Sequence, residues 1–177
     1  MKKILFIIAL GSFLTACKKD KELVHLNSEQ RALLLYNVSD SFSLIKNETD
    51  TINFFVDNKE SAYYPTNNGL WSFGPYYERT FIEYYNDSGI RSEINIGSKQ
   101  TENDGQNFSH LFLINTRDYM NFPHYQKTDD YTLNNKRYKN CYLLTGYLDN
   151  DTMYVSTDVG ILYIKSEEGD EYKLLEK

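Results

Sequence analysis

The side chains that could carry out chemistry in this 177-residue chain are few and widely spaced. Its cysteines are Cys17 and Cys141, and its histidines are His25, His110 and His124. No two histidines have the i, i+4 spacing that holds zinc on a helix. We therefore predict no metal site, and we expect the chain to use no cofactor.

Nucleophilic catalysis is not favoured by the sequence either. Apolar alternation around Cys141 places its side chain on one strand face with Leu143, where a buried thiol behaves as a small hydrophobe. A catalytic thiol would need a neighbouring base and an electropositive setting, and no G-x-S-x-G elbow occurs that could present a serine. The acidic run at 149–151 lacks the glycine and the final glutamate of a calcium loop, so it predicts a solvated hairpin turn. We expect a protein that is not an enzyme.

Cys17 differs from Cys141 because it directly follows an export-type segment. Two lysines precede an apolar run from residue 4 to residue 14, which is shorter than the roughly 20 residues of a membrane-spanning helix. The sequence L-T-A-C at 14–17 resembles the lipobox of bacterial lipoproteins. The resemblance implies that residues 1–16 are a signal peptide cut before Cys17. It also implies that the thiol carries diacylglycerol and that the new N-terminus carries an acyl chain such as palmitate.

The net charge of the chain limits which classes of partner it is expected to bind. Without the signal-peptide lysines, 17 basic side chains remain against 25 acidic ones, a net charge of about −8. This balance argues against a nucleic-acid partner and against an electrostatic hold on anionic lipid. We expect the membrane to be the partner through the acyl chains on Cys17 alone. Lipidation would leave Cys141 without a partner, so the fold must be stable without a disulfide.

Beyond Cys17 the sequence predicts a tether at 17–27 and one β domain at 28–177. Ser28 is a plausible N-cap for a short helical turn. From Ser41 onward apolar residues alternate, and turns rich in Asn, Asp and Gly recur. The strands that we expect lie at 42–44, 52–56, 76–85, 90–96, 108–115, 137–148, 152–157, 160–166 and 171–175.

This pattern predicts a mainly β fold, a single domain of about eight or nine antiparallel strands in a curved meander. A parallel fold is excluded because no crossover helices are available. A sheet of this width usually curls, closes or splits into two layers. A half-open barrel, a closed barrel and a sandwich therefore remain alternatives.

The region from Tyr63 to Tyr77 gathers six aromatic residues with prolines, glycines and amides. We expect a loop here. Aromatic faces with amide side chains nearby suit sugar rings or apolar ligands, which makes Tyr64, Trp71, Phe73 and Tyr76 our candidate ligand-binding residues. Alternatively, the rings at 71 and 73 fold back and plug one end of the sheet.

The lipobox, the charged tether and the runs "YTLNNKRYKNCYLL" and "MYVSTDVGILYIKSEEGDEYKLLE" together resemble the small β-rich lipoproteins abundant in Bacteroidota. The resemblance implies export and lipid anchoring to the outer membrane. Acidic residues after the lipidated cysteine direct such proteins to the surface; Asp20 and Glu22 match this signal in part, and Lys21 interrupts it, so the periplasmic and surface faces stay open. The Asp-Thr-apolar pattern also implies O-glycosylation at Thr51 and Thr152.

Three functional hypotheses follow from these features. The first is a membrane-anchored envelope lipoprotein that serves as a non-enzymatic binding or assembly module, with an envelope protein or a glycan as its partner. The second is a carrier that holds an acyl chain or another apolar ligand inside the curved sheet. The third is a hydrolase, for which the sequence offers only isolated carboxylates.

Overall fold

The computed structural model describes residues 22–65, 75–98, 108–113, 119–146 and 150–175. Its elements are β1 (Leu23–Val24), α2 (Ser28–Ala32), β2 (Ser41–Lys46), β3 (Asp50–Pro65), β4 (Tyr76–Asn86), β5 (Arg91–Gly97), β6 (Phe108–Leu113), β7 (Tyr119–Phe122), β8 (His124–Leu133), β9 (Lys136–Thr145), β10 (Thr152–Ser156), β11 (Gly160–Lys165) and β12 (Glu171–Leu174).

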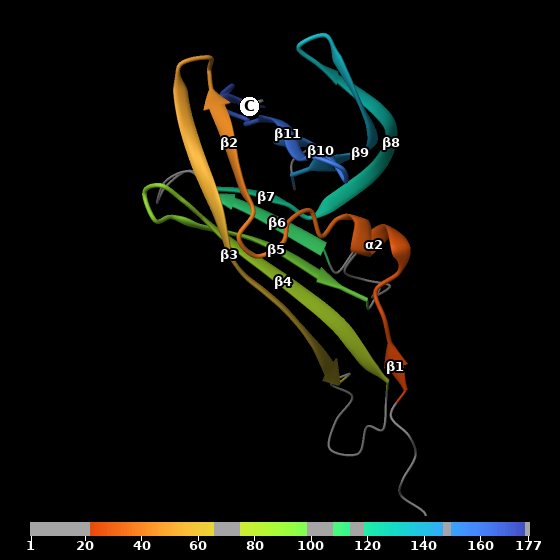
Figure 1. Cartoon of the computed structure of the whole chain (residues 1–177). Helices are drawn as coiled ribbons and strands as arrows, with labels where there is room; N and C mark the ends of the chain where they lie inside the picture. The colour runs from red at the N-terminus through yellow and green to blue at the C-terminus, as the bar shows by residue number, and fades with distance from the viewer. Residues whose placement is uncertain (1–21, 66–74, 99–107, 114–118, 147–149, 176–177) are drawn as a thin grey trace, which may run out of the picture.

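All twelve described strands belong to one sheet, in the order β7-β6-β5-β4-β3-β2-β12-β11-β10-β9-β8, with β1 beside β4 (Figure 1). Every pair along this path is antiparallel, and the short β1 is parallel to β4. The predicted mainly β, antiparallel fold is confirmed. The strands β1, β7 and β8 are additional to the nine predicted ranges: β1 and β7 are only two and four residues long, and polar residues in β8 conceal its alternation.

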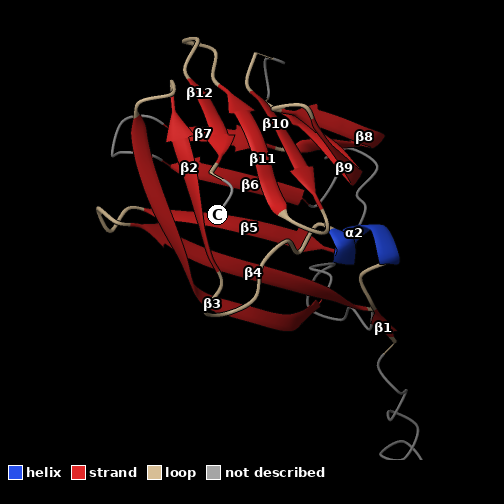
Figure 2. Ribbon diagram, turned by 45° about the horizontal axis from the view of Figure 1, so that its top comes forward, coloured by secondary structure: helices blue, strands red, loops and turns tan. Residues whose placement is uncertain are grey.

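The two ends of the sheet path are consecutive in the chain. β7 ends at Phe122, β8 begins at His124, and only the buried Pro123 lies between them. Proline fixes its φ angle and has no N–H to offer a ladder, which suits a corner where the chain leaves one end of the sheet and begins the other. The sheet therefore curls into a nearly closed barrel (Figure 2).

The interior of this barrel is filled with aromatic rings. Phe42 stacks on Tyr36 with ring centroids 4.6 Å apart and on Phe54 at 4.9 Å. Tyr84 packs its edge against all three. Such pairs add stability beyond the area that they bury, so these rings join the neighbouring strands β2, β3 and β4 to the segment that precedes β2.

The hairpin of β8 and β9 forms a second, smaller cluster on the other face of the sheet. Asn140 has a φ of 53°, and the pair Asp129–Asn140 is missing from a β8–β9 ladder whose register is the same on both sides. The left-handed backbone of this one residue interrupts the regular alternation of side chains along β9. Accordingly, Tyr138 and Cys141 pack with Leu162 outside the main core, whereas Tyr142 packs inside it.

The N-terminal segment is more ordered than the predicted tether. Residues 23–24 form β1, and the helix is capped by Asn27 instead of Ser28. The Asn27 side chain accepts a hydrogen bond from the Gln30 backbone, and the Gln30 side chain accepts one from the Asn27 backbone. This reciprocal capping box stabilises a helix that is too short to persist alone. Within the described residues, the folded domain therefore begins at β1 and includes residues expected to be tether.

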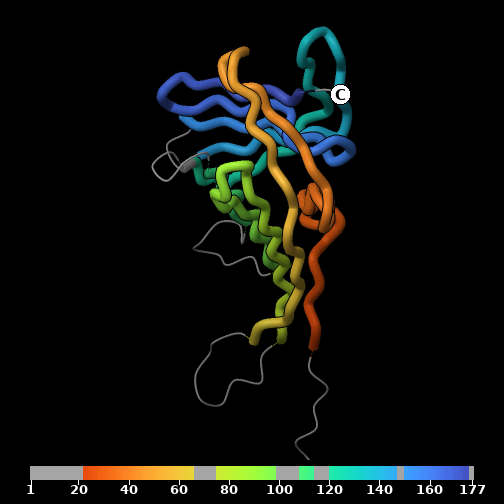
Figure 3. Tube along the Cα trace, turned by 60° about the vertical axis from the view of Figure 1, so that its left-hand side comes forward, coloured from red at the N-terminus to blue at the C-terminus, as the bar shows by residue number. Residues whose placement is uncertain are grey.

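β3 and β4 extend beyond the barrel as a long arm, which Figure 3 shows projecting from one end. We call its outer part the tongue: β1, Ser61–Pro65 of β3 and Tyr76–Glu78 of β4. From Asp57 to Pro65 none of the residues of β3 is buried. The prediction of a loop from Tyr63 onward was wrong at its first edge, because Tyr63 to Pro65 pair with Glu78 to Tyr76 in a regular ladder, whereas the strand predicted to begin at residue 76 is confirmed as β4.

Candidate functional site

The buried carboxylate of Glu78 attaches the N-terminal segment to the base of the tongue. It accepts a hydrogen bond from the backbone N–H of Leu26 at 3.0 Å and from the Arg31 guanidinium at 2.7 Å. His25 Nδ1 lies 3.4 Å from the same carboxylate oxygen. A buried charge is tolerated only where it is paired and hydrogen-bonded. Glu78 therefore acts as a hub that positions β1 and α2.

Hydrogen bonds to the neighbouring strand complete this attachment. The Gln30 side-chain amide donates to the Gly97 carbonyl at 2.9 Å, and the Ser98 hydroxyl donates to the Val24 carbonyl at 2.9 Å. β1 takes the place of β5 beside the outer part of β4. The last β5 residue, Gly97, pairs with Arg79, and Val24 of β1 pairs with Tyr77. The tongue is consequently three strands wide.

Large apolar side chains are exposed at the end of the tongue. Leu23 is 48 % exposed, Tyr64 is 45 % exposed and Tyr63 is 37 % exposed. The Tyr63 hydroxyl hydrogen-bonds to His25 Nδ1 at 2.7 Å, and the His25 ring meets the Tyr63 ring edge-on. Tyr63 is thus held in place on one face of the tongue.

The candidate ligand-binding aromatics do not form one platform in the structure. Tyr64 pairs with Tyr77, and Tyr76 pairs with Pro65. Because neighbouring residues of a strand point to opposite faces, Tyr64 and Tyr76 lie on opposite faces of the tongue. Trp71 and Phe73 lie outside the described residues, as does Cys17.

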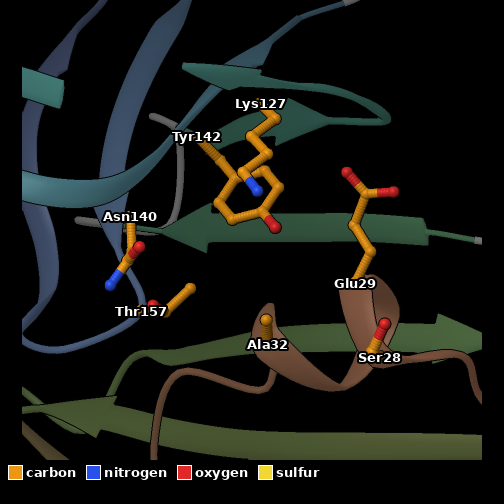
Figure 4. Close-up of a pocket in the computed structure, with 7 residues that line it drawn as sticks. All are labelled: Ser28, Glu29, Ala32, Lys127, Asn140, Tyr142 and Thr157. Carbon is orange, nitrogen blue, oxygen red and sulfur yellow. The ribbon is translucent and has the colours of Figure 1, made fainter. Parts of the chain in front are cut away.

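A pocket of about 450 Å³ lies between α2 and the β8–β9 hairpin (Figure 4). Its lining consists of Ser28, Glu29, Ala32, Lys127, Asn140, Tyr142 and Thr157. Burial raises the pKa of the Tyr142 hydroxyl, and the Glu29 carboxylate raises it further. The hydroxyl therefore stays protonated and able to donate. An acid, a lysine, hydroxyls and an amide together suit a small polar ligand.

The interior of the barrel contains a buried polar pair. His110 hydrogen-bonds through Nε2 to the Tyr84 hydroxyl, and its Nδ1 has no hydrogen-bond partner among the described residues. Burial lowers the pKa of His110 to about 3, so the ring is neutral at pH 7. Packed rings surround this pair. The described interior is thus occupied by the chain's own side chains, which does not favour the carrier hypothesis.

The remaining predicted positions are structurally simple. Cys141 is buried, its thiol donates to the carbonyls of Tyr138 and Lys139, and burial raises its pKa, all of which oppose nucleophilic chemistry. Thr51 is exposed at the start of β3, and Thr152 is half-buried at the start of β10. In the part of the chain that the structure describes, no cluster of three or more His, Cys, Asp or Glu side chains could hold a metal ion.

No protein-family model matches the chain, and neither the curated proteins nor the solved structures that were searched include a significant match. The sequence did not reveal Glu78 as a hub or Glu29 and Lys127 as neighbours of one pocket. One signal was available for Glu78: it is a charged residue at a position of β4 where the alternation places a buried side chain, between Tyr76 and Thr80.

Proposed function

We propose that the protein is a lipid-anchored envelope lipoprotein whose β domain serves as a non-enzymatic binding or assembly module. The observation that carries this proposal is the position of β1. Five residues separate Cys17 from Leu23, the first residue of β1, and they span at most about 20 Å when extended. The chain from the lipobox cysteine therefore enters the domain at its projecting tongue.

This geometry suits a tethered domain. The tongue projects from one end of the barrel, and the turn between β2 and β3 lies at the other end of the long β3 strand (Figures 1 and 3). An anchor at Cys17 would bring the tongue next to the membrane and direct the barrel away from it. No helix among the described residues is long and apolar enough to cross a membrane.

The pocket beside α2 is the site at which the binding activity of such a module would reside. It is formed by elements far apart in the chain, α2 and the β8–β9 hairpin, and its walls carry both signs of charge. The Glu78 hub fixes α2 on the sheet, so one wall of the pocket is held in position before a ligand arrives. Preorganisation of this kind reduces the entropy cost of binding.

Metabolic labelling with palmitate tests the proposal. The wild-type chain should incorporate label and sediment with membranes, whereas Cys17→Ala should lose the label and leave the membrane fraction, because no thiol remains to receive the lipid. Cys141→Ala is the matched control: it removes the other cysteine, which is buried, and should keep both label and membrane association. Labelled, membrane-bound Cys17→Ala protein would refute the anchor.

A further inference from the structure

We infer that the tongue is a membrane-contact element that inserts its aromatic tip into the interfacial region of the lipid bilayer that holds Cys17. The inference rests on the proposed lipid anchor and goes beyond it. The acyl chains would attach the protein, and the tongue would fix its orientation at the membrane surface.

The composition of the tip favours a lipid interface. Between Glu60 and Glu78, the described residues are Ser61 to Pro65 and Pro75 to Tyr77, and none of them is charged. Four of these eight residues are tyrosines. Tyrosine is enriched where a membrane meets water, because its ring enters the apolar region while its hydroxyl stays hydrated. The β3 and β4 strands of the tip are thus uncharged and rich in tyrosine, which suits that environment, and the charged side chain beside them is the exposed Glu22, whose carbonyl accepts a hydrogen bond from the Tyr76 N–H.

The arrangement of the side chains favours insertion of the tip end-on. Tyr63 and Tyr64 point to opposite faces of the tongue, and Leu23 lies on the neighbouring strand β1. A flat partner surface could cover only one of these faces. A bilayer entered by the end of the tongue would surround all three side chains at once.

The open edge of β3 argues against a second protein strand as the occupant. Val56 exchanges backbone hydrogen bonds with Ser39 and Asp40, and beyond it β3 pairs only with β4, so the outer part of its other edge is unpaired in the described part of the sheet. That edge contains a bulge between Val56 and Asn58, and Lys59 and Pro65 lie along it. Bulges, lysines and prolines are the devices that keep edge strands from pairing with other chains. A lipid surface needs no strand pairing and is unaffected by them.

The short chain length between Cys17 and the tongue also supports a membrane contact. Leu23 begins β1 at the outer end of the tongue and pairs with Tyr76. Because Cys17 lies within about 20 Å of Leu23 along the chain, the tip stays close to the bilayer whenever the cysteine is lipidated. A short linker raises the effective concentration of the tip at the membrane. Weak contacts between the tip and lipid are therefore sufficient to keep the tip bound.

Site-directed spin labelling of the full, lipid-anchored chain tests this inference. The label is placed at Tyr64→Cys and, separately, at Phe55→Cys. Both positions carry an exposed aromatic residue on the same face of β3, and they are nine residues apart, or about 30 Å at about 3.3 Å per residue. The buried Cys141 is shielded from the reagent, and Cys17 is blocked by lipid if anchored. Far-UV circular dichroism of each labelled chain checks that it is folded.

The labelled chains are reconstituted into vesicles of phosphatidylcholine and phosphatidylethanolamine, and collision with a water-soluble nickel complex is compared with collision with oxygen. We expect the label at position 64 to be several-fold less accessible to nickel than the label at 55, and more accessible to oxygen. Equal nickel accessibility on vesicles that retain the protein would overturn the tongue contact and leave the anchor intact. Protection at position 64 that persists in the Cys17→Ala chain without vesicles would indicate a protein contact and would also overturn it. Chains that fail to float with the vesicles would refute the anchor, and the inference with it.

Discussion

The barrel interior and the tongue are built from the same kinds of residues but use them in opposite ways. Phe54 in the barrel is 0 % exposed, whereas Tyr64 in the tongue, on the same strand β3, is 45 % exposed. In the barrel, rings from several strands fill the space enclosed by the curved sheet. In the tongue, no strand that the structure describes lies opposite either face, and the rings of Tyr63 and Tyr64 are exposed. The difference shows that burial of an aromatic residue depends on what the rest of the chain places opposite it, more than on its own strand.

Replacing Phe54 and Phe55 separately by alanine should give the largest contrast. Phe54 stacks on Phe42 and contacts Phe112 and Tyr84, so Phe54→Ala should lower the free energy of unfolding by about 3–5 kcal/mol. Phe55→Ala should change it by only about 0.5 kcal/mol or less, as for most surface substitutions. Urea denaturation of both variants measures the difference. Equal losses would mean that the outer face of β3 is covered in solution.

The fold class and the chemistry of the turns could be predicted because both are local. Asn134 and Asn135 have φ angles of 50° and 63°, as expected for the hairpin turn read from the sequence. β4 alternates buried and less buried residues over its length, which the period-two pattern indicated. These features depend on backbone preferences within a few residues, so the sequence alone contains them.

The features that were missed depend on distant segments. The closure at Pro123, the break in the β8–β9 ladder at Asn140 and the extension of β3 to Pro65 each depend on which strands lie beside or opposite them. The same holds for the pocket, since Glu29 and Lys127 meet only when α2 docks on the sheet. A one-dimensional pattern does not specify such contacts. Tyr64 and Tyr76 were grouped as ligand candidates for this reason, although the ladder places them on opposite faces.

The neutral His110 makes the stability of the barrel interior depend on pH. Its pKa is lowered by burial to about 3, whereas an unfolded histidine titrates near 6.5. Between these values the unfolded state binds more protons, so this residue makes the native state progressively less stable as pH falls, by up to about 1.4 kcal/mol per pH unit. His110→Gln should therefore flatten the decline in unfolding free energy between pH 6.5 and pH 4.

Urea denaturation across that pH range measures the effect of His110→Gln. His124→Gln is the control, because it removes a histidine whose side chain is exposed, at the start of β8. An unchanged slope in His110→Gln would contradict the neutral, buried histidine and would imply that water reaches the barrel interior. The experiment thus separates a dry, filled core from a solvated one.

Glu78 lies where the two regions meet, on the buried face of β4 at the base of the tongue. Glu78→Gln keeps an acceptor for the Leu26 N–H and removes the charge that pairs with Arg31. Because Arg31 is half exposed, solvent screens part of this ion pair, and we expect a loss of only about 1–2 kcal/mol. Glu83→Gln is the matched control, since its carboxylate also pairs with an arginine, Arg91, but lies on the other face of β4.

The loss at Glu78 should be local. Glu78 bonds to both Leu26 and Arg31, so amide hydrogen exchange in Glu78→Gln should accelerate at Leu26 and through α2 while the amides of Phe54 and Tyr84 stay protected. Uniform acceleration would mean that the N-terminal segment and the barrel unfold as one unit. Local acceleration would mean that one buried carboxylate couples the tongue to the filled barrel. In that case the tongue and the wall of the pocket formed by α2 depend on the same carboxylate.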